Sequence, residues 1–242
     1  MKLDILVLAA HPDDAELSCS GTIVKHIRAG KSVGIVDFTR GELGTRGSAE
    51  IRDREARASA EIMGLAVREN LQFADGFFTN DQAHQMEVIR MLRKYKPEVV
   101  FCNAKEDRHP DHQKGGELAT VSCFLAGLKK IETFDEGHTQ EAWRPKAVYQ
   151  YIQSNYIAPD FVVDCSEVWD VKMAAVKAFS SQFFTGDTAD GNAEDQTFIS
   201  TPAFVEFLNA RGREYGQHIG VEYAEGFTTT RLMGVDDVFD LI

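Results

Sequence analysis

The sequence predicts an α/β fold: a Rossmann-like, mostly parallel sheet with helices on both faces. Its first half alternates short apolar runs with longer segments in which apolar or small residues recur three and four positions apart. Runs that are apolar throughout are typical of parallel strands covered on both faces. Strands separated by helices also imply right-handed crossovers. With 242 residues and 43% hydrophobic content, the chain is long and apolar enough for a sizeable core.

The first half reads as a repeating strand-helix pattern. Strands are expected at residues 3–9, 32–39 and 97–103, with a weaker one at 70–74. Helices are expected at 15–30, 48–64 and 81–97, because two of these segments end on Gly and one on Pro, which are helix stop signals. A further helix is expected from residue 112 to 130.

The second half is less regular. It predicts strands at 146–153 and 160–166, helices at 167–183 and 202–217, and a Gly/Asp/Thr-rich loop at 185–201. No repeat or linker interrupts the chain, so we expect one domain over residues 1–242, with a core of about 1–130 and an elaboration of about 131–242. The tail is expected to return over the sheet edge, which could bring His218 near a pocket there.

Charge and composition exclude several classes of protein. The chain has 26 Lys+Arg against 38 Asp+Glu, a net charge of −12, which disfavours binding to nucleic acid or to anionic membranes. Its four cysteines form no Cys-x-x-Cys pair and lie mostly among apolar residues, as buried reduced thiols do. No run approaches the roughly 20 apolar residues of a membrane span. We therefore expect a cytoplasmic protein with no membrane partner.

Two clusters of polar residues follow predicted strands. The motif HPDD at 11–14 follows the first strand, and RHPDH at 108–112 follows the strand at 97–103. In parallel sheets, ligands collect outside the carboxyl ends of the strands. The proline in each motif keeps the residue before it, His11 or His109, in an extended conformation. The sequence therefore predicts one site built from both motifs.

The residue types in these motifs indicate metal-assisted hydrolysis. His11, Asp14 and His112 make the two-His, one-carboxylate set with which a catalytic zinc leaves a fourth position for water. Such a metal acts as a Lewis acid and lowers the pKa of its water to about 7. Asp13 is then free to act as general base. Another divalent transition metal could occupy the same nitrogen and oxygen donors.

The second motif also supplies a candidate for stabilising negative charge. His109 could donate to the oxyanion of a tetrahedral intermediate, with Asp111 orienting its ring and favouring its charged form. The alternative is structural: Asp-Asp after a strand can be a helix N-cap, and His-Pro-Asp can be a plain turn. The coincidence of both motifs at one sheet edge favours a site. No Ser or Cys lies in a nucleophile elbow.

The motifs AHPDDAE and HPDH resemble those of the zinc-dependent N-acetylglucosamine deacetylase family, known as PIG-L or LmbE-like. The resemblance implies the same roles: His11, Asp14 and His112 as zinc ligands, Asp13 as base and His109 as oxyanion donor. Segments 39–56, 181–183 and 223–227 are most similar to the bacillithiol-biosynthesis branch of the family.

The resemblance also implies a function and an assembly. It implies removal of acetate from an N-acetylglucosamine conjugate, most specifically N-acetylglucosaminyl malate, by a homo-oligomer. Two alternatives stay open: a deacetylase of another N-acetylated sugar, such as a chito-oligosaccharide or antibiotic precursor, or a non-catalytic relative that binds metal or sugar.

Three arginines are candidates for substrate binding. The resemblance implies that Arg52 binds sugar; otherwise it is an exposed helix arginine paired with Glu55. Arg108 is either a clamp for a substrate carboxylate or a structural partner of Asp107. Arg46, in the glycine-containing loop 41–47, either meets an anionic substrate group or is solvated.

Overall fold

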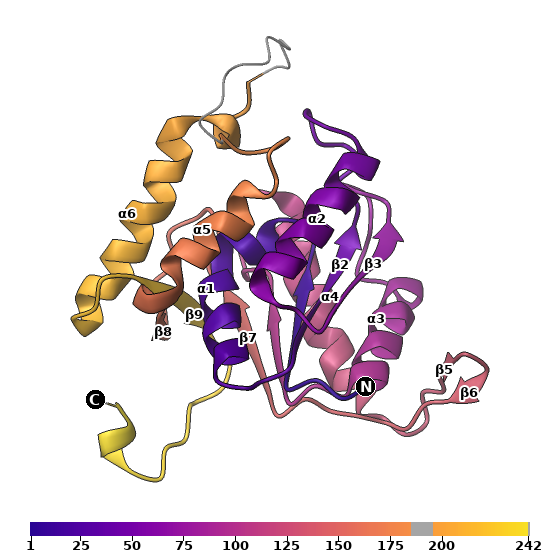
Figure 1. Cartoon of the computed structure of the whole chain (residues 1–242). Helices are drawn as coiled ribbons and strands as arrows, with labels where there is room; N and C mark the ends of the chain where they lie inside the picture. The colour runs from indigo at the N-terminus through magenta and orange to yellow at the C-terminus, as the bar shows by residue number, and fades with distance from the viewer. Residues whose placement is uncertain (185–195, 242) are drawn as a thin grey trace.

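The computed structural model describes residues 1–184 and 196–241, and a seven-stranded sheet runs through it (Figure 1). Its strand order is β3-β2-β1-β4-β7-β9-β8. The strands are β1 (Ile5–Ala9), β2 (Val33–Thr39), β3 (Val67–Phe73), β4 (Val99–Cys102), β7 (Ala147–Tyr151), β8 (Phe161–Asp164) and β9 (Ala224–Thr228). The first five strands in this order are parallel, and β9 runs antiparallel to both neighbours. The predicted α/β class with a mostly parallel sheet is confirmed.

Helices cover both faces of the sheet. They are α1 (Asp14–Arg28), α2 (Ala49–Met63), α3 (Gln82–Tyr95), α4 (Pro110–Ala126), α5 (Trp169–Lys177) and α6 (Pro202–Ile219). In Figure 1, α1, α2 and α5 lie on one face, α3 and α4 lie on the other, and α6 packs beside β8 and β9. None of the helices in the described ranges is long and apolar enough to cross a membrane.

Strand β1 shows why its sequence is apolar at every position. Leu6 and Leu8 pack into the core on the α3/α4 side, whereas Ile5 and Val7 pack into the core under α1 and α5. Successive side chains of a strand point to opposite faces, so a strand covered on both faces has no polar position. All four cysteines are buried free thiols, as the sequence predicts.

Strand β9 and the short hairpin of β5 (Phe134–Asp135) and β6 (His138–Thr139) are not predicted by the sequence pattern. In β9 the sequence AEGFT breaks the apolar pattern, because Glu225 lies inside the molecule, 3% exposed. Its carboxylate Oε1 pairs with the Nζ atom of Lys172 at 2.7 Å. A charged residue can be buried in a strand when a partner far away in sequence neutralises it. Such a strand lacks the apolar pattern by which strands are predicted.

Two helices differ from a predicted bound by more than two residues, and one of them, α4, ends at Ala126 instead of 130. Helix α4 begins at Pro110, two residues early, because proline suits the first turn. Helix α5 ends at Lys177 instead of 183, and beyond it Ser181 donates its backbone N–H and its hydroxyl to Glu55. Of the predicted loop 185–201, residues 185–195 lie outside the described residues, and Phe198–Ser200 forms a short 3-10 helix.

The strand order sets the position of a crevice. The chain runs from β1 outward through β2 to β3, and then returns to place β4 on the other side of β1. At such a reversal the loops after β1 and β4 part in opposite directions, which opens a crevice at the carboxyl ends of these strands. Both predicted motifs follow these two strands.

Candidate metal centre and active site

The three predicted metal ligands come together at this crevice. His11 follows β1, Asp14 opens α1, and His112 lies in the first turn of α4. The Nε2 atom of His112 is 3.0 Å from Oδ1 of Asp14, and Nδ1 of His11 is 3.6 Å from Oδ2. Ligand atoms of a tetrahedral zinc are about 3.3 Å apart, given metal–ligand bonds near 2.0–2.1 Å. Both distances from Asp14 are close to this spacing, and one nitrogen of each of His11, His109 and His112 lies within 4.8 Å of the other two.

A second layer of carboxylates fixes the orientation of both imidazoles. The Nε2 atom of His11 lies 3.0 Å from Asp75 and 3.3 Å from Asp111, and Nδ1 of His112 lies 2.9 Å from Asp107. In each ring the far nitrogen can donate a proton to a carboxylate, so the nitrogen that faces Asp14 is the one that would bind a metal. Metal-binding histidines are oriented in this way in proteins.

Neutral side chains hold Asp14 in place. Asn103 donates to its Oδ2 atom at 2.9 Å and Gln153 donates to Oδ1 at 3.1 Å, while the backbone N–H of His11 also donates to Oδ2. The sequence analysis missed Asn103 and Gln153, and it also missed Asp75. A signal was present, because all three follow the last residues of parallel strands.

The electrostatics of the cluster favour a cation. Burial lowers the pKa of His112, but the Asp14 carboxylate and the bond to Asp107 outweigh this effect and raise it to about 9. The same acidic surroundings raise the pKa of His11 against the effect of burial. The carboxylates around both histidines create a negative potential that holds these protons. A divalent cation can replace the protons there.

Asp13 adopts a strained backbone at the start of α1. Its φ of 121° lies where non-glycine residues are rare, and such strain concentrates at functional sites. Although it occupies the N-cap position, its side chain makes no capping hydrogen bond. Instead its Oδ2 atom accepts from Nη2 of Arg52 at 2.6 Å. Burial raises the pKa of Asp13 to about 6, while the Arg52 charge acts to lower it.

Arg52 is part of the site, and the exposed-helix interpretation of it is wrong. The residue is 6% exposed and lines the same cavity as Asp13. Its Nη1 atom donates to the carbonyl of Gly41 at 3.1 Å, and Glu55 binds Ser180 and Ser181 instead. A side chain at Gly41 would collide with this guanidinium.

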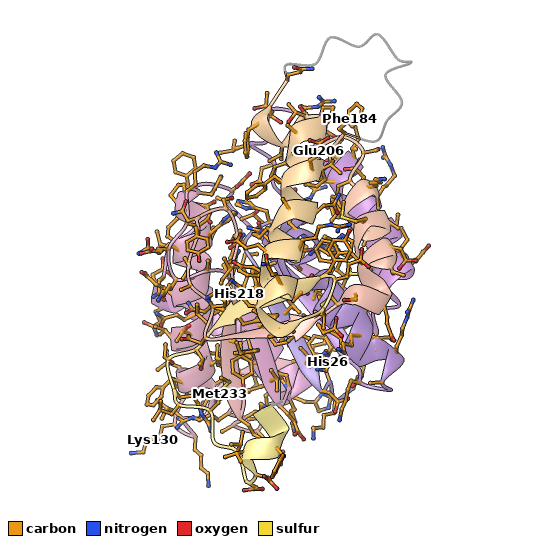
Figure 2. The ribbon with its side chains drawn as sticks, turned by 90° about the vertical axis from the view of Figure 1, so that its left-hand side faces the viewer. His26, Lys130, Phe184, Glu206, His218 and Met233 are labelled. Carbon is orange, nitrogen blue, oxygen red and sulfur yellow. The ribbon has the colours of Figure 1, made fainter. Side chains whose placement is uncertain are left out.

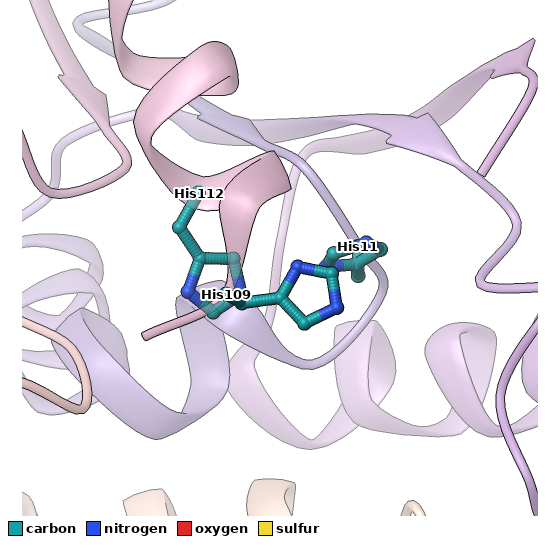
Figure 3. A group of neighbouring side chains, drawn as sticks. All are labelled: His11, His109 and His112. Atoms are coloured by element: carbon teal, nitrogen blue, oxygen red, sulfur yellow. The ribbon is translucent and has the colours of Figure 1, made fainter. Parts of the chain in front are cut away.

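His109 is oriented by backbone. It is the N-cap of α4 in the extended conformation expected before Pro110, and its Nδ1 atom accepts from the backbone N–H of Asp111 at 3.2 Å. Since Nδ1 accepts, the proton of the neutral ring is on Nε2. The ring lies beside those of His11 and His112, with centroids 4.8 and 5.0 Å away (Figure 3).

The predicted action of Asp111 on His109 differs from the structure. The Asp111 carboxylate binds Lys114 at 2.6 Å and the Gly76 N–H at 2.7 Å, besides its contact with His11. Burial, followed by the charges of His11 and His112, lowers the pKa of His109. The ring is therefore held by the Asp111 backbone and kept neutral, whereas the carboxylate supports His11.

The site opens into a cavity of about 470 Å3. Arg108 is exposed at its rim, with its guanidinium carbon 5.7 Å from the centre of the Phe198 ring. Asp107 does not pair with Arg108, because it accepts from His112 and from backbone N–H groups of Ser154 and Asn155.

Two other candidates lie outside the lining of this cavity. The Nε atom of Arg46 donates to the carbonyl of Ser181 at 3.0 Å. His218 is near the opposite end of α6 from Glu206 (Figure 2), roughly 21 Å along the helix from the cavity residue Phe204. The expectation that the tail could bring His218 to the pocket is wrong.

The fold and the site define a class: an α/β protein with a buried two-His, one-carboxylate donor set at the carboxyl edge of its sheet. A family model described as "PIG-L: GlcNAc-PI de-N-acetylase" matches residues 6–123, which include every predicted ligand. Over this segment the chain is similar to the PIG-L family.

Individual relatives extend the likeness over nearly the whole chain. A solved structure of a conserved protein from Thermus thermophilus is 36% identical, with a TM-score of 0.85 over 97% of this chain and 98% of that one. Diacetylchitobiose deacetylase of Thermococcus kodakarensis is 29% identical over 92% of this chain and 81% of its own length. The 4-oxalmesaconate hydratase of Pseudomonas putida is 28% identical over 73% of each chain.

Proposed function

We propose that this protein is a metal-dependent N-deacetylase that releases acetate and a free amine from an N-acetylated amino sugar or its conjugate. One observation carries the proposal. The donor set of His11, Asp14 and His112 shares a cavity with a carboxylate that is not needed as a ligand, Asp13, and with an N–H donor, His109. A site that only binds metal has no use for Asp13, whose carboxylate accepts from Arg52.

The roles follow from the geometry. A zinc ion held by His11, Asp14 and His112 would supply a Lewis acid and a nucleophilic water near neutral pH. Cobalt, nickel and iron suit the same donors. Asp13 accepts the proton of the attacking water and returns it to the amine nitrogen as the C–N bond breaks. His109 donates its Nε2–H to the carbonyl oxygen as that atom gains negative charge.

For the substrate we propose N-acetylglucosaminyl malate, the compound of the bacillithiol pathway. Its support is the resemblance of the segments around Arg52 and the exposed cation of Arg108 at the cavity rim, where an anionic aglycone would emerge. A neutral chito-oligosaccharide is the alternative, because the Thermococcus relative is a diacetylchitobiose deacetylase. The proposed homo-oligomer has no bearing on this choice.

The test is release of primary amine from a panel that contains N-acetylglucosaminyl malate, diacetylchitobiose and N-acetylglucosamine. We expect turnover that needs added zinc and is fastest with the malate conjugate. Asp13→Asn is the matched control: it should keep its metal and lose about 10²–10⁴-fold in turnover. If diacetylchitobiose is turned over as fast as the malate conjugate, the proposed substrate is contradicted but the proposed N-deacetylase reaction is not.

The hydratase relative supplies a competing reaction, addition of water to an unsaturated acid. The panel therefore includes 4-oxalmesaconate, and its hydration is measured as a loss of absorbance. Hydration without release of any amine from zinc-loaded protein would overturn the deacetylase proposal.

A further inference from the structure

A small cavity lies between α1, α6 and β9, apart from the active-site cavity. Three buried polar atoms of residues that line it have no hydrogen-bond partner in the described part of the chain: Oγ of Ser18, Nη1 of Arg211 and Oη of Tyr215. Ser18 is 5% and Tyr215 is 3% exposed. Leaving such groups unsatisfied is costly, and native proteins provide them with a protein group, water or ion as partner.

Arg211 lacks a carboxylate partner among the described residues. Three acidic groups act on it: both oxygens of Glu225 accept backbone N–H groups of α1, Asp107 binds His112, and Glu214 is exposed to solvent. Burial lowers the pKa of Arg211, which is the mark of a cation without a close counter-ion. Its guanidinium instead stacks on Phe207, with the guanidinium carbon 5.3 Å from the ring centre.

The charge around the cavity is positive by one. Lys172 also lines it, but its ammonium is neutralised by Glu225 at 2.7 Å, so the charge of Arg211 remains. The hydroxyls of Ser18 and Tyr215 can both donate. A water molecule would satisfy hydrogen bonds and leave the charge uncompensated, whereas an anion satisfies both needs.

We propose that this cavity binds one monatomic anion, chloride in a physiological medium, between Arg211, Tyr215 and Ser18. The cavity measures about 10 Å3, which is room for about one water-sized species. Acetate, phosphate and sugars are excluded by size. The ion joins α6 to the part of α1 that follows Asp14, so it stabilises the helix that carries the metal ligand.

Thermal unfolding in sodium chloride and in sodium gluconate of equal ionic strength tests this proposal, because gluconate is too large for the cavity. We expect chloride to raise the Tm by roughly 3 °C and the effect to saturate. Arg211→Met should abolish the chloride effect and melt above the wild type in gluconate, because an apolar side chain replaces an uncompensated charge. Arg213→Met, which alters an exposed arginine of the same helix, should keep the effect.

Bromide locates the ion directly. Crystals of the wild-type protein grown in sodium bromide should show one anomalous peak between Arg211, Tyr215 and Ser18. Should Arg211→Met fail to fold, Tyr215→Phe and the bromide data still decide the matter. An equal Tm in both salts together with no anomalous peak would mean that water alone fills the cavity, and the proposal would be overturned.

Discussion

Two of the buried ionic clusters that helix α1 contacts are the candidate metal centre at its start and the Lys172–Glu225 pair beside its middle. In the second cluster each charged atom is saturated: Glu225 accepts from the N–H groups of Gly21 and Thr22 at 2.9 and 2.7 Å and from Lys172. In the candidate metal centre, Nδ1 of His11 and Nε2 of His112 both face the Asp14 carboxylate, at the wall of a cavity. Two imidazole nitrogens and a carboxylate that converge at a cavity, and not burial of charge, distinguish the site.

The saturated cluster has its own structural role. Lys172 donates to the carbonyls of Glu16 and Leu17, at 3.2 and 2.9 Å, so the ion pair binds backbone donors and acceptors inside α1. Side chains that insert beside the helical hydrogen bonds in this way bend or fix a helix. The pair therefore helps to set the direction in which the first turn of α1 presents its acidic residues.

Substitution of His112 is expected to have the largest effect on the candidate metal centre. We expect His112→Ala to lose stoichiometric zinc and to lower deacetylase turnover by more than about 100-fold, because even outer partners of metal ligands contribute about 10–100-fold. Metal content after dialysis, measured by plasma mass spectrometry, is the readout. His138→Ala, in the distant β5–β6 hairpin, is the control and should keep both properties. Full zinc occupancy in His112→Ala would remove His112 as a ligand.

Lys172→Met tests the saturated cluster. It leaves the Glu225 carboxylate buried without its cation, so we expect a loss of about 3–5 kcal/mol in the free energy of unfolding, measured with urea. The double variant Lys172→Met/Glu225→Leu should recover much of this loss. Lys177→Met, on the exposed face of α5, should change little. A single variant as stable as the wild type would show that the pair does not support α1.

The sequence was sufficient to predict most of the parallel strands and to place both motifs at one edge of the sheet. β1, β2 and β4 are apolar at nearly every position, and HPDD and HPDH carry their ligands at the ends of strands that must be neighbours. Such features depend on local pattern and on the rule that parallel strands end at one edge.

The missed features depend on contacts between distant segments. Strand β9 is polar at Glu225 because Lys172, 53 residues away, neutralises it. Asp75 acts on His11 from 64 residues away, and its position just after a parallel strand is the only feature of the sequence that marks it. Arg52 was interpreted from its own helix, whereas its partner Asp13 precedes a different one.

In the proposed active site, Arg52 binds the carboxylate of Asp13, the proposed general base. Asp13 works as a base only when ionised, so activity should rise with pH through its pKa. Arg52 acts to lower that pKa, so Arg52→Met should raise it and move the acidic limb of the kcat/KM profile to higher pH by about one unit. Arg54→Met, an exposed change on the same helix, should leave the profile unmoved. A limb that stays in place would show that Asp13 does not control it.

The smallest effect is expected at the cavity rim, where Arg108 is exposed and solvent screens its charge. Exposed ion pairs contribute about 0.2–1 kcal/mol, so Arg108→Gln should raise the KM for N-acetylglucosaminyl malate only about 1.5–5-fold, with kcat unchanged. The KM for neutral diacetylchitobiose should not change, and Lys105→Gln in the same loop should affect neither substrate. An equal rise for both substrates would mean that Arg108 shapes the rim through its stacking on Phe198 and does not bind an anion.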